Sequence, residues 1–221
     1  MKIILFVAPP AAGKGTQSEM ISKRYKIPHI SVGAMLRKEV AEKTEIGKKI
    51  DKILKEGYLI DDKLTIKIVE KRTNKQDCNK GYILDGFPRS LNQVNLYEEL
   101  LKKTNKKINY VFYLKIDKEI AYKRIEGRLT CNDCHLIYNI NDENMKPLIE
   151  NKCDHCGQPL VKRNDDSLET FETRLKTYLT LTKPLLNYYK NKGILYEIDS
   201  NDTKENIFNK IVTIIDGDAN D

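Results

Sequence analysis

The sequence predicts an α/β protein in which helices cover both faces of a parallel β-sheet. The apolar run at residues 3–7 has the length of a buried strand, and it leads through a short loop into a helix-forming segment. Strand-like and helical segments then alternate along the chain, which is typical of parallel sheets with crossover helices. Two pairs of cysteines between residues 131 and 156 interrupt this alternation and predict a small insert.

The composition is that of a soluble globular protein, because 40% of the 221 residues are hydrophobic and 32% are charged. The apolar run near the N-terminus is far too short for a signal peptide or a membrane span. We therefore expect a cytoplasmic protein with reduced thiols and no membrane partner. The net charge of +7 suits a polyanionic partner, either nucleotides or nucleic acid, and charge alone does not choose between them.

Caps and breakers mark the elements of the first half of the chain. Ser31 is a good N-cap for the helix that follows the short extended piece at 28–31. Gly57 is suited to end a helix, and Asp61 with Asp62 to begin the next one. The expected helices cover residues 16–25, 33–42, 46–56 and 63–73, and a buried strand covers 82–84.

The second half continues the same alternation. Asp117 is expected to cap a helix that runs to Arg128, and Pro184 to stop a long helix that begins at Ser167. The expected helices cover residues 90–103, 117–128, 167–182 and 203–215, and the strands 110–116 and 194–198. The acidic tail from Asp216 onward is expected to be frayed.

The loop after the first strand predicts a phosphate site. A strand that turns into a helix brings free backbone N–H groups and the positive end of the helix dipole together, which favours an anion. Lys14 in the first helical turn is unfavourable unless an anion binds beside it. The general P-loop motif has glycine where Ala8 stands, so an ordinary turn with a surface lysine stays an alternative. The loop residues expected at the phosphates are Ala11, Ala12, Gly13, Lys14, Gly15 and Thr16.

The cysteine insert predicts a structural metal site. Two Cys-x2-Cys pairs separated by 18 residues can close four thiolates tetrahedrally on Zn²⁺. The alternatives are disulfides, which a reducing compartment disfavours, and four unrelated thiols. Four sulfurs complete the coordination, so His135 and His155 are not expected to bind the metal. The metal is expected to hold residues 129–163 together. The expected ligands are Cys131, Cys134, Cys153 and Cys156.

Further charged residues suit a nucleotide. Asp85 and Arg89 follow a buried strand, where the carboxylate can hold Mg²⁺ or its waters and the guanidinium can bind a phosphate. Taken alone, the same residues also fit a simple turn. Arg124 and Arg128 lack an acidic partner one turn away and face each other on the expected helix, a repulsion of about 0.2–0.5 kcal/mol that a bound polyphosphate would reverse.

Arg163 and Arg174 add positive charge beyond the cysteine insert. Asp165 and Asp166 are expected either to orient Arg163 or to cap the following helix. Phosphoryl transfer needs such charged residues, because catalysis depends on positioning, Mg²⁺ and several cations around the transferred group.

Taken together, these motifs resemble the adenylate kinases over residues 1 to about 215. The motifs that resemble the family are the phosphate loop, Met35-Leu36-Arg37, Asp-Gly-Phe-Pro-Arg at 85–89 with Gln93, the arginines and the cysteine insert. The insert is similar to the zinc-bearing lid of many bacterial members. It implies a P-loop three-layer fold with a core of residues 1–30, 61–128 and 164–216. It also implies a helical arm of 31–60 that closes on AMP, a zinc lid of 129–163 that closes on ATP, and a disordered tail of 217–221.

The resemblance further implies reversible, Mg²⁺-dependent phosphoryl transfer from ATP to AMP by a monomer that binds no nucleic acid. The catalytic residues would be Lys14, Asp85, Arg89, Arg124, Arg163 and Arg174. ATP would contact residues 11–16, Arg124, Arg128, Ile137 and Tyr138. AMP would contact Val32, Arg37, Tyr58, Leu59, Ile60, Gly86, Arg89, Gln93, Arg163 and Arg174.

The chain departs from the family pattern at four positions. Ala8 and Ala11 replace glycines, and a positive φ at Ala11 would cost about 1–2 kcal/mol. Val32 lacks the hydroxyl of the usual threonine, a hydrogen bond worth roughly 0.5–1.5 kcal/mol, and Ala34 lacks a carboxylate. These changes leave open a kinase for another nucleoside monophosphate or a nucleotide-binding pseudoenzyme.

A nucleic-acid-binding zinc ribbon is a further alternative. It is disfavoured because residues inside the ribbon are poor phosphate contacts. These residues are Asn132, Asp133, Asp154 and Gln158.

Overall fold

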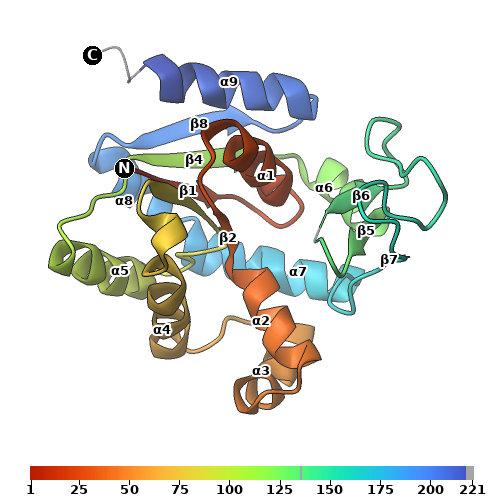
Figure 1. Cartoon of the computed structure of the whole chain (residues 1–221), viewed down its shortest axis with the longest axis horizontal. Coiled ribbons are helices and arrows are strands. Elements are labelled where there is room, and N and C mark those ends of the chain that lie inside the picture. The colour runs from red at the N-terminus through yellow and green to blue at the C-terminus, as the bar shows by residue number, and fades with distance from the viewer. Residues whose placement is uncertain (135, 218–221) are drawn as a thin grey trace.

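The computed structural model, which describes residues 1–134 and 136–217, contains the expected parallel sheet between two helical layers (Figure 1). The sheet has five strands in the order β2-β3-β1-β4-β8. Their bounds are β1 Lys2–Val7, β2 His29–Ser31, β3 Gly81–Asp85, β4 Tyr110–Lys115 and β8 Leu195–Asp199. All strand pairs in this sheet are parallel, which confirms the predicted fold class.

The central strand β1 divides its side chains between two cores, because successive residues of a strand point to opposite faces. Ile3 and Leu5 pack on one face, where they meet α4 (Asp62–Thr73), α5 (Leu91–Lys103) and α8 (Leu185–Asn191). Ile4 and Phe6 pack on the other face against α1 (Lys14–Tyr25) and α9 (Lys204–Gly217). Both faces are covered, so the carboxyl edge of the sheet is left for a ligand.

The segment 31–60 forms an arm below the sheet in Figure 1, with α2 (Val32–Ala41) packed on α3 (Glu45–Lys55). The expected caps are confirmed. The Ser31 hydroxyl accepts a hydrogen bond from the Ala34 N–H, and Asp61 accepts one from the Leu64 N–H at 2.8 Å. Gly57 follows α3 with φ of 82°, the left-handed conformation that commonly ends a helix.

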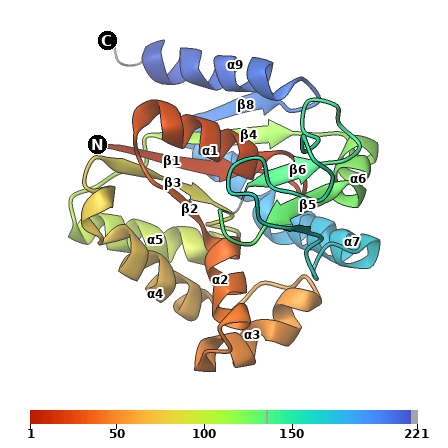
Figure 2. The same cartoon turned by 45° about the vertical axis from the view of Figure 1, so that its right-hand side comes forward.

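The cysteine insert forms its own small antiparallel sheet, which the sequence did not predict. Its strands β5 (Arg128–Cys131), β6 (Ile137–Asn139) and β7 (Leu160–Val161) lie in the order β6-β5-β7. In Figure 2 this sheet comes forward beside the carboxyl edge of the main sheet. Position 135 lies outside the described residues, so the interpretation of His135 is not addressed by the structure.

Two expectations about the second half were wrong, those for the helix to Arg128 and for Asp216. Helix α6 (Lys118–Glu126) ends before Arg128, which instead begins β5, and the Asp117 side chain makes no cap hydrogen bond. The long helix is present as expected, as α7 (Leu168–Thr177) continued by a π-helical turn at Tyr178–Thr182, and it ends before Pro184. Asp216 lies within α9 and binds Arg24 and Tyr25, so the chain is ordered through Gly217. Residues 218–221 of the predicted tail lie outside the described part.

A short 3-10 turn at Gln76–Cys78 precedes β3, and Cys78 is fully buried there. Among the described residues, none of the helices is both long and apolar enough to span a membrane.

Candidate active site

The loop between β1 and α1 forms a corner suited to an anion. Gly13 precedes the helix with φ of 88°, and α1 has neither a side-chain cap nor an acidic residue in its first turn. The first amides of the helix are therefore left for a ligand. Ala11 has φ of 62°, the strained conformation anticipated for an alanine at a glycine position.

Lys14 is turned back over this loop. Its Nζ donates hydrogen bonds to the carbonyls of Ala8 at 3.2 Å and Pro9 at 3.1 Å. Burial lowers the pKa of Lys14 to about 8, and the charges of Arg89 and Arg128 act in the same direction. The negative charge of an anion at the loop would offset both the burial and the repulsion that lower the pKa of Lys14.

Ser200, which the sequence analysis missed, fixes the loop from the opposite side. It directly follows β8 and is fully buried. Its hydroxyl donates to the Ala12 carbonyl at 2.6 Å, while its own carbonyl accepts a hydrogen bond from Arg124 at 3.0 Å. The sequence could have indicated Ser200 through its position directly after a predicted parallel strand, because polar residues at the carboxyl ends of such strands line the ligand crevice.

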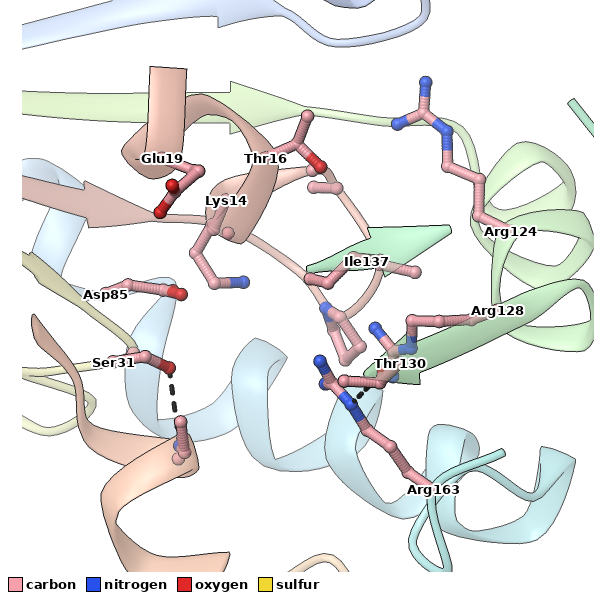
Figure 3. Close-up of a pocket in the computed structure, with 18 of the residues that line it drawn as sticks. Lys14, Thr16, Glu19, Ser31, Asp85, Arg124, Arg128, Thr130, Ile137 and Arg163 are labelled. Atoms are coloured by element: carbon pink, nitrogen blue, oxygen red, sulfur yellow. Dashed lines mark hydrogen bonds between the residues drawn. The ribbon is translucent and has the colours of Figure 1, made fainter. Parts of the chain in front are cut away.

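Asp85 lies at the end of β3, facing Lys14 (Figure 3). Its carboxylate is 3.4 Å from His29 Nε2, and the other ring nitrogen of His29 is 3.7 Å from Glu19. Burial alone would raise the pKa of Asp85, but the hydrogen bond and charge of His29 hold it at about 2. Burial lowers the pKa of His29, and its two carboxylate neighbours outweigh this and raise it to about 9. Asp85 is therefore ionised, as a ligand of Mg²⁺ or of its waters must be.

Basic side chains from different parts of the chain meet in one cavity of about 1970 Å³. Burial lowers the pKa of Arg89 to about 10, with Arg174 adding to the effect. Burial likewise lowers the pKa of Arg163 to about 9, with Arg128 contributing. Figure 3 shows Arg128 and Arg163 turned toward each other across the lower part of the cavity. The cations that line it include Lys14, Arg37, Arg89, Arg124, Arg128, Arg163 and Arg174.

Two buried aspartates pair with several of these cations. Asp166 binds Arg128, and Asp165 binds Arg174 and lies 3.6 Å from Arg37. Burial alone would raise the pKa of Asp165, but Arg174 and Arg37 keep it below its usual value. The capping role considered from the sequence was wrong, because Ser167 caps α7. Arg163 donates to the Thr130 hydroxyl at 2.9 Å, and the charges of Asp165 and Asp166 act on it electrostatically.

All the residues expected at ATP line the same cavity, namely 11–16, Arg124, Arg128, Ile137 and Tyr138. Ile137 reaches the phosphate loop, since its Cδ1 would lie 3.1 Å from a Cβ placed on Gly15. Arg124 and Arg128 reach the cavity from separate elements, a helix and a strand, and not from one helical face.

The residues expected at AMP are more dispersed. Arg37, Leu59, Gly86, Arg89, Arg163 and Arg174 line the cavity, and Tyr58 is 57% exposed. Val32 and Ile60 are buried in the core. Gln93 is anchored within the protein, because it accepts a hydrogen bond from the Arg89 N–H at 2.8 Å and donates one to Asp62 at 2.7 Å. Gln93 thus fixes the backbone of Arg89, and its contact with AMP stays a prediction.

The four cysteines of the insert form one cluster, with ligand atoms within 4.8 Å of one another. Cys131 and Cys156 have their sulfurs 3.4 Å apart, as do Cys134 and Cys153. Disulfide sulfurs lie at about 2.05 Å, whereas a Zn–S distance of about 2.3 Å places tetrahedral sulfurs roughly 3.8 Å apart. The hydrogen bond with Tyr138 lowers the pKa of Cys153 to about 6, whereas burial raises the pKa of Cys134 to about 12. The donor set therefore fits a closed metal site, and the exposed His155 is not part of it.

A phosphate loop, an ionised carboxylate and a cation-lined cavity at the carboxyl edge of a parallel sheet define a P-loop phosphotransferase. Comparison with known proteins specifies the class further. The sequence profile of the family described as adenylate kinase matches residues 6–194.

An adenylate kinase from Archaeoglobus fulgidus is 43% identical over 213 residues, covering 96% of this chain and 97% of the relative. One from Fervidobacterium nodosum is 38% identical, with 97% of each chain covered, and one from Clostridium botulinum is 39% identical over 99% of this chain and 100% of its own. The chain belongs to the adenylate kinase family.

Proposed function

We propose that this chain catalyses the reversible transfer of the terminal phosphoryl group of ATP to AMP, giving two ADP. The observation that carries the proposal is the cavity of about 1970 Å³ in which cations from several elements converge beside the phosphate loop. Pockets for one small ligand measure about 300–1,000 Å³, so this volume suits two nucleotides placed end to end. Their phosphates would balance the cations, whose burial and mutual repulsion lower several pKa values.

The roles we propose follow from position in the cavity. Lys14 and the amides of residues 13–16 would hold the ATP phosphates, with Arg128 on the lid strand β5. Arg37 and Arg89 lie on the side of the arm and would hold the AMP phosphate. Arg163 and Arg174 lie between the two groups and would neutralise the charge of the transferred phosphoryl group.

Asp85 would hold the Mg²⁺ that accompanies ATP, either directly or through waters. When bound, this ion neutralises phosphate charge and orients the transferred group. The protein's own contribution is to keep the carboxylate ionised, with its pKa at about 2, and to hold it in place through His29. Closure of the segments 31–60 and 129–163 over the cavity would exclude water, so that AMP and not solvent receives the phosphoryl group.

The metal of the four-cysteine cluster is proposed to be Zn²⁺, because four thiolates at tetrahedral spacing suit it. It would be structural, holding the insert around its small core of Tyr138 and Leu160. Four reduced sulfurs fit the reducing cytoplasm, which we propose as the location of the protein, and we propose that it acts there as a monomer.

A coupled assay of ADP formation with a panel of nucleoside monophosphates tests the proposal. ATP with AMP and Mg²⁺ should give ADP. Lys14→Met should reduce turnover at least a hundredfold, while Lys102→Met on the exposed face of α5 should leave it unchanged. Turnover with another monophosphate but not AMP would identify a different acceptor, and ATP binding without any turnover would identify a pseudoenzyme.

A further inference from the structure

Strand β6 lies between the metal cluster and the phosphate loop, and Tyr138 is its central residue. Tyr138 is 8% exposed, and its hydroxyl oxygen is 3.5 Å from Cys153 Sγ. The same oxygen accepts a hydrogen bond from the Asp154 N–H at 2.9 Å. Since the oxygen already accepts and a metal-bound thiolate has no proton, the phenol proton is the one that lies between oxygen and sulfur.

The two neighbours of Tyr138 on β6 each contact a different part of the nucleotide cavity. Ile137 packs against Gly15 of the phosphate loop. Asn139 donates a hydrogen bond at 3.0 Å to the carbonyl of Arg124, at the end of α6. One three-residue strand therefore contacts the metal cluster, the phosphate loop and the helix that carries Arg124.

Strand β5 extends this connection. Tyr138 pairs with Leu129, and Ile137 pairs with Thr130, whose hydroxyl accepts the hydrogen bond of Arg163. The same strand begins at Arg128 and ends at the cluster residue Cys131. A shift of β6 along β5 would therefore change its contact with the phosphate loop and the contacts that position Arg124 and Arg163 at the same time.

We propose that the Tyr138 hydroxyl is an outer-shell hydrogen-bond donor to the metal-bound thiolate of Cys153, and that it couples metal retention to nucleotide binding through β6. The proposal rests on the metal site and the nucleotide cavity described under the proposed function. Outer-shell partners of metal ligands typically change metal affinity by about 10–100-fold. Coupling of binding free energies is reciprocal, so a nucleotide that contacts β6 must raise the affinity for the metal if the metal strengthens nucleotide binding. We expect this higher affinity to appear as slower metal release.

The first test measures the rate of Zn²⁺ release to a chromogenic chelator from the full-length protein. Tyr138→Phe removes only the hydroxyl, and we expect release to become about tenfold faster, the low end for an outer-shell partner. Tyr189→Phe is the matched control, because that hydroxyl is buried in the sheet core and has no hydrogen-bond partner among the described residues. Equal release rates in wild type and Tyr138→Phe would overturn the proposal.

A spectroscopic test separates hydrogen bonding from general loosening of the insert. In the Co²⁺-substituted protein, loss of a hydrogen bond to sulfur raises the energy of its lone pairs. The thiolate-to-metal charge-transfer band of Tyr138→Phe should therefore shift to longer wavelength, while Tyr189→Phe should match wild type. An unchanged band in Tyr138→Phe contradicts a hydrogen bond to the coordinated sulfur.

The coupling is tested by adding saturating ADP to the release assay. ADP should slow release several-fold in wild type and clearly less in Tyr138→Phe. Free Zn²⁺ mixed with the chelator and the same concentration of ADP, without protein, corrects for metal taken up by ADP itself. Equal protection of wild type and Tyr138→Phe overturns the coupling. A purified protein that takes up no Zn²⁺ or Co²⁺ would instead refute the metal site on which the inference rests.

Discussion

The guanidinium of Arg128 is paired side-on with the carboxylate of Asp166, with Nε 2.7 Å from Oδ2 and Nη2 bound to the other oxygen. Such bidentate pairs are the stronger and more directional form of the arginine–carboxylate contact. The pair joins the lid strand β5 to the segment that precedes α7, and the Asp166 side chain is fully buried. It therefore orients an arginine of the cavity before any phosphate arrives.

The pair makes Asp166 a strong determinant of stability. Asp166→Asn leaves Arg128 without its buried counter-charge, and breaking a buried pair costs about 3–5 kcal/mol, while Arg174 keeps its partner Asp165. Thermal or urea unfolding should show this loss. Glu172→Gln removes a half-exposed partner of Lys118 and should cost less than about 1 kcal/mol. Similar losses in the two variants would show that the buried pair contributes little.

Arg128 is also a residue whose partner could not be predicted from the local sequence. The absence of an acid one turn away predicted two unpaired arginines on one helix. Helix α6 ends early because Asn139 and Asn141 return from the lid to bind its last carbonyls, at Arg124 and Lys123. A Cβ on Gly127 would lie 2.2 Å from the Asn139 side chain, so glycine is required there. Gly127 itself was a usable stop signal, whereas the asparagine contacts and the partner Asp166 come from tertiary structure.

The phosphate loop contains a strained alanine that a single substitution can relieve. Ala11 has φ of 62°, which glycine adopts freely. Ala11→Gly should remove about 1–2 kcal/mol of strain and lose roughly 0.4–1 kcal/mol through the more flexible unfolded chain, for a net gain of about 0.5–1 kcal/mol. Equilibrium unfolding in urea measures the difference.

Ala12→Gly is the matched control for this gain. Ala12 is 1% exposed in the core beside β1 and is not among the residues with positive φ, so glycine there should lower stability by about 1 kcal/mol. A loss of stability in both variants would mean that the conformation of Ala11 carries no strain.

His29 gives stability a defined pH dependence. Its pKa is raised to about 9 by Asp85 and Glu19 despite burial, while an unfolded histidine titrates near about 6.5. A raised folded pKa stabilises the protein fully below the unfolded value, and the contribution is lost as pH rises from about 6.5 to 9. The shift corresponds to at most about 3 kcal/mol.

Melting temperatures between pH 6 and 9.5 test this contribution. Lys14, whose pKa is lowered, titrates with the opposite sign in both proteins, so the two profiles are compared with each other. The stability advantage of wild type over His29→Gln should be largest at pH 6 and should shrink as pH rises to 9. Parallel profiles for the two proteins would mean that His29 is not held protonated between the carboxylates.

The strand–loop–helix corner, the sheet and most helices were predictable because they depend on local periodicity and caps. Ser31 and Asp61 cap the expected helices, for example. The π-helical turn at Tyr178–Thr182 was not predictable, since its Thr182 hydroxyl binds the carbonyl of Arg89, 93 positions away in sequence. Wide turns of this type are frequent at functional sites, and this one supports the backbone of a cavity arginine.

The metal cluster is expected to stabilise the insert through binding energy. A ligand that binds only the folded state adds about 4 kcal/mol at a thousandfold excess over its dissociation constant, so loss of one thiolate should lower metal content and melting temperature together. Cys131→Ser removes a fully buried member of the cluster. Cys78→Ser, outside the cluster and beside Arg72, should keep the metal whatever its effect on folding. A strong chelator should then lower the melting temperature of wild type and Cys78→Ser but leave that of Cys131→Ser nearly unchanged. If chelation removes the metal from wild type without lowering its melting temperature, the cluster does not stabilise the insert.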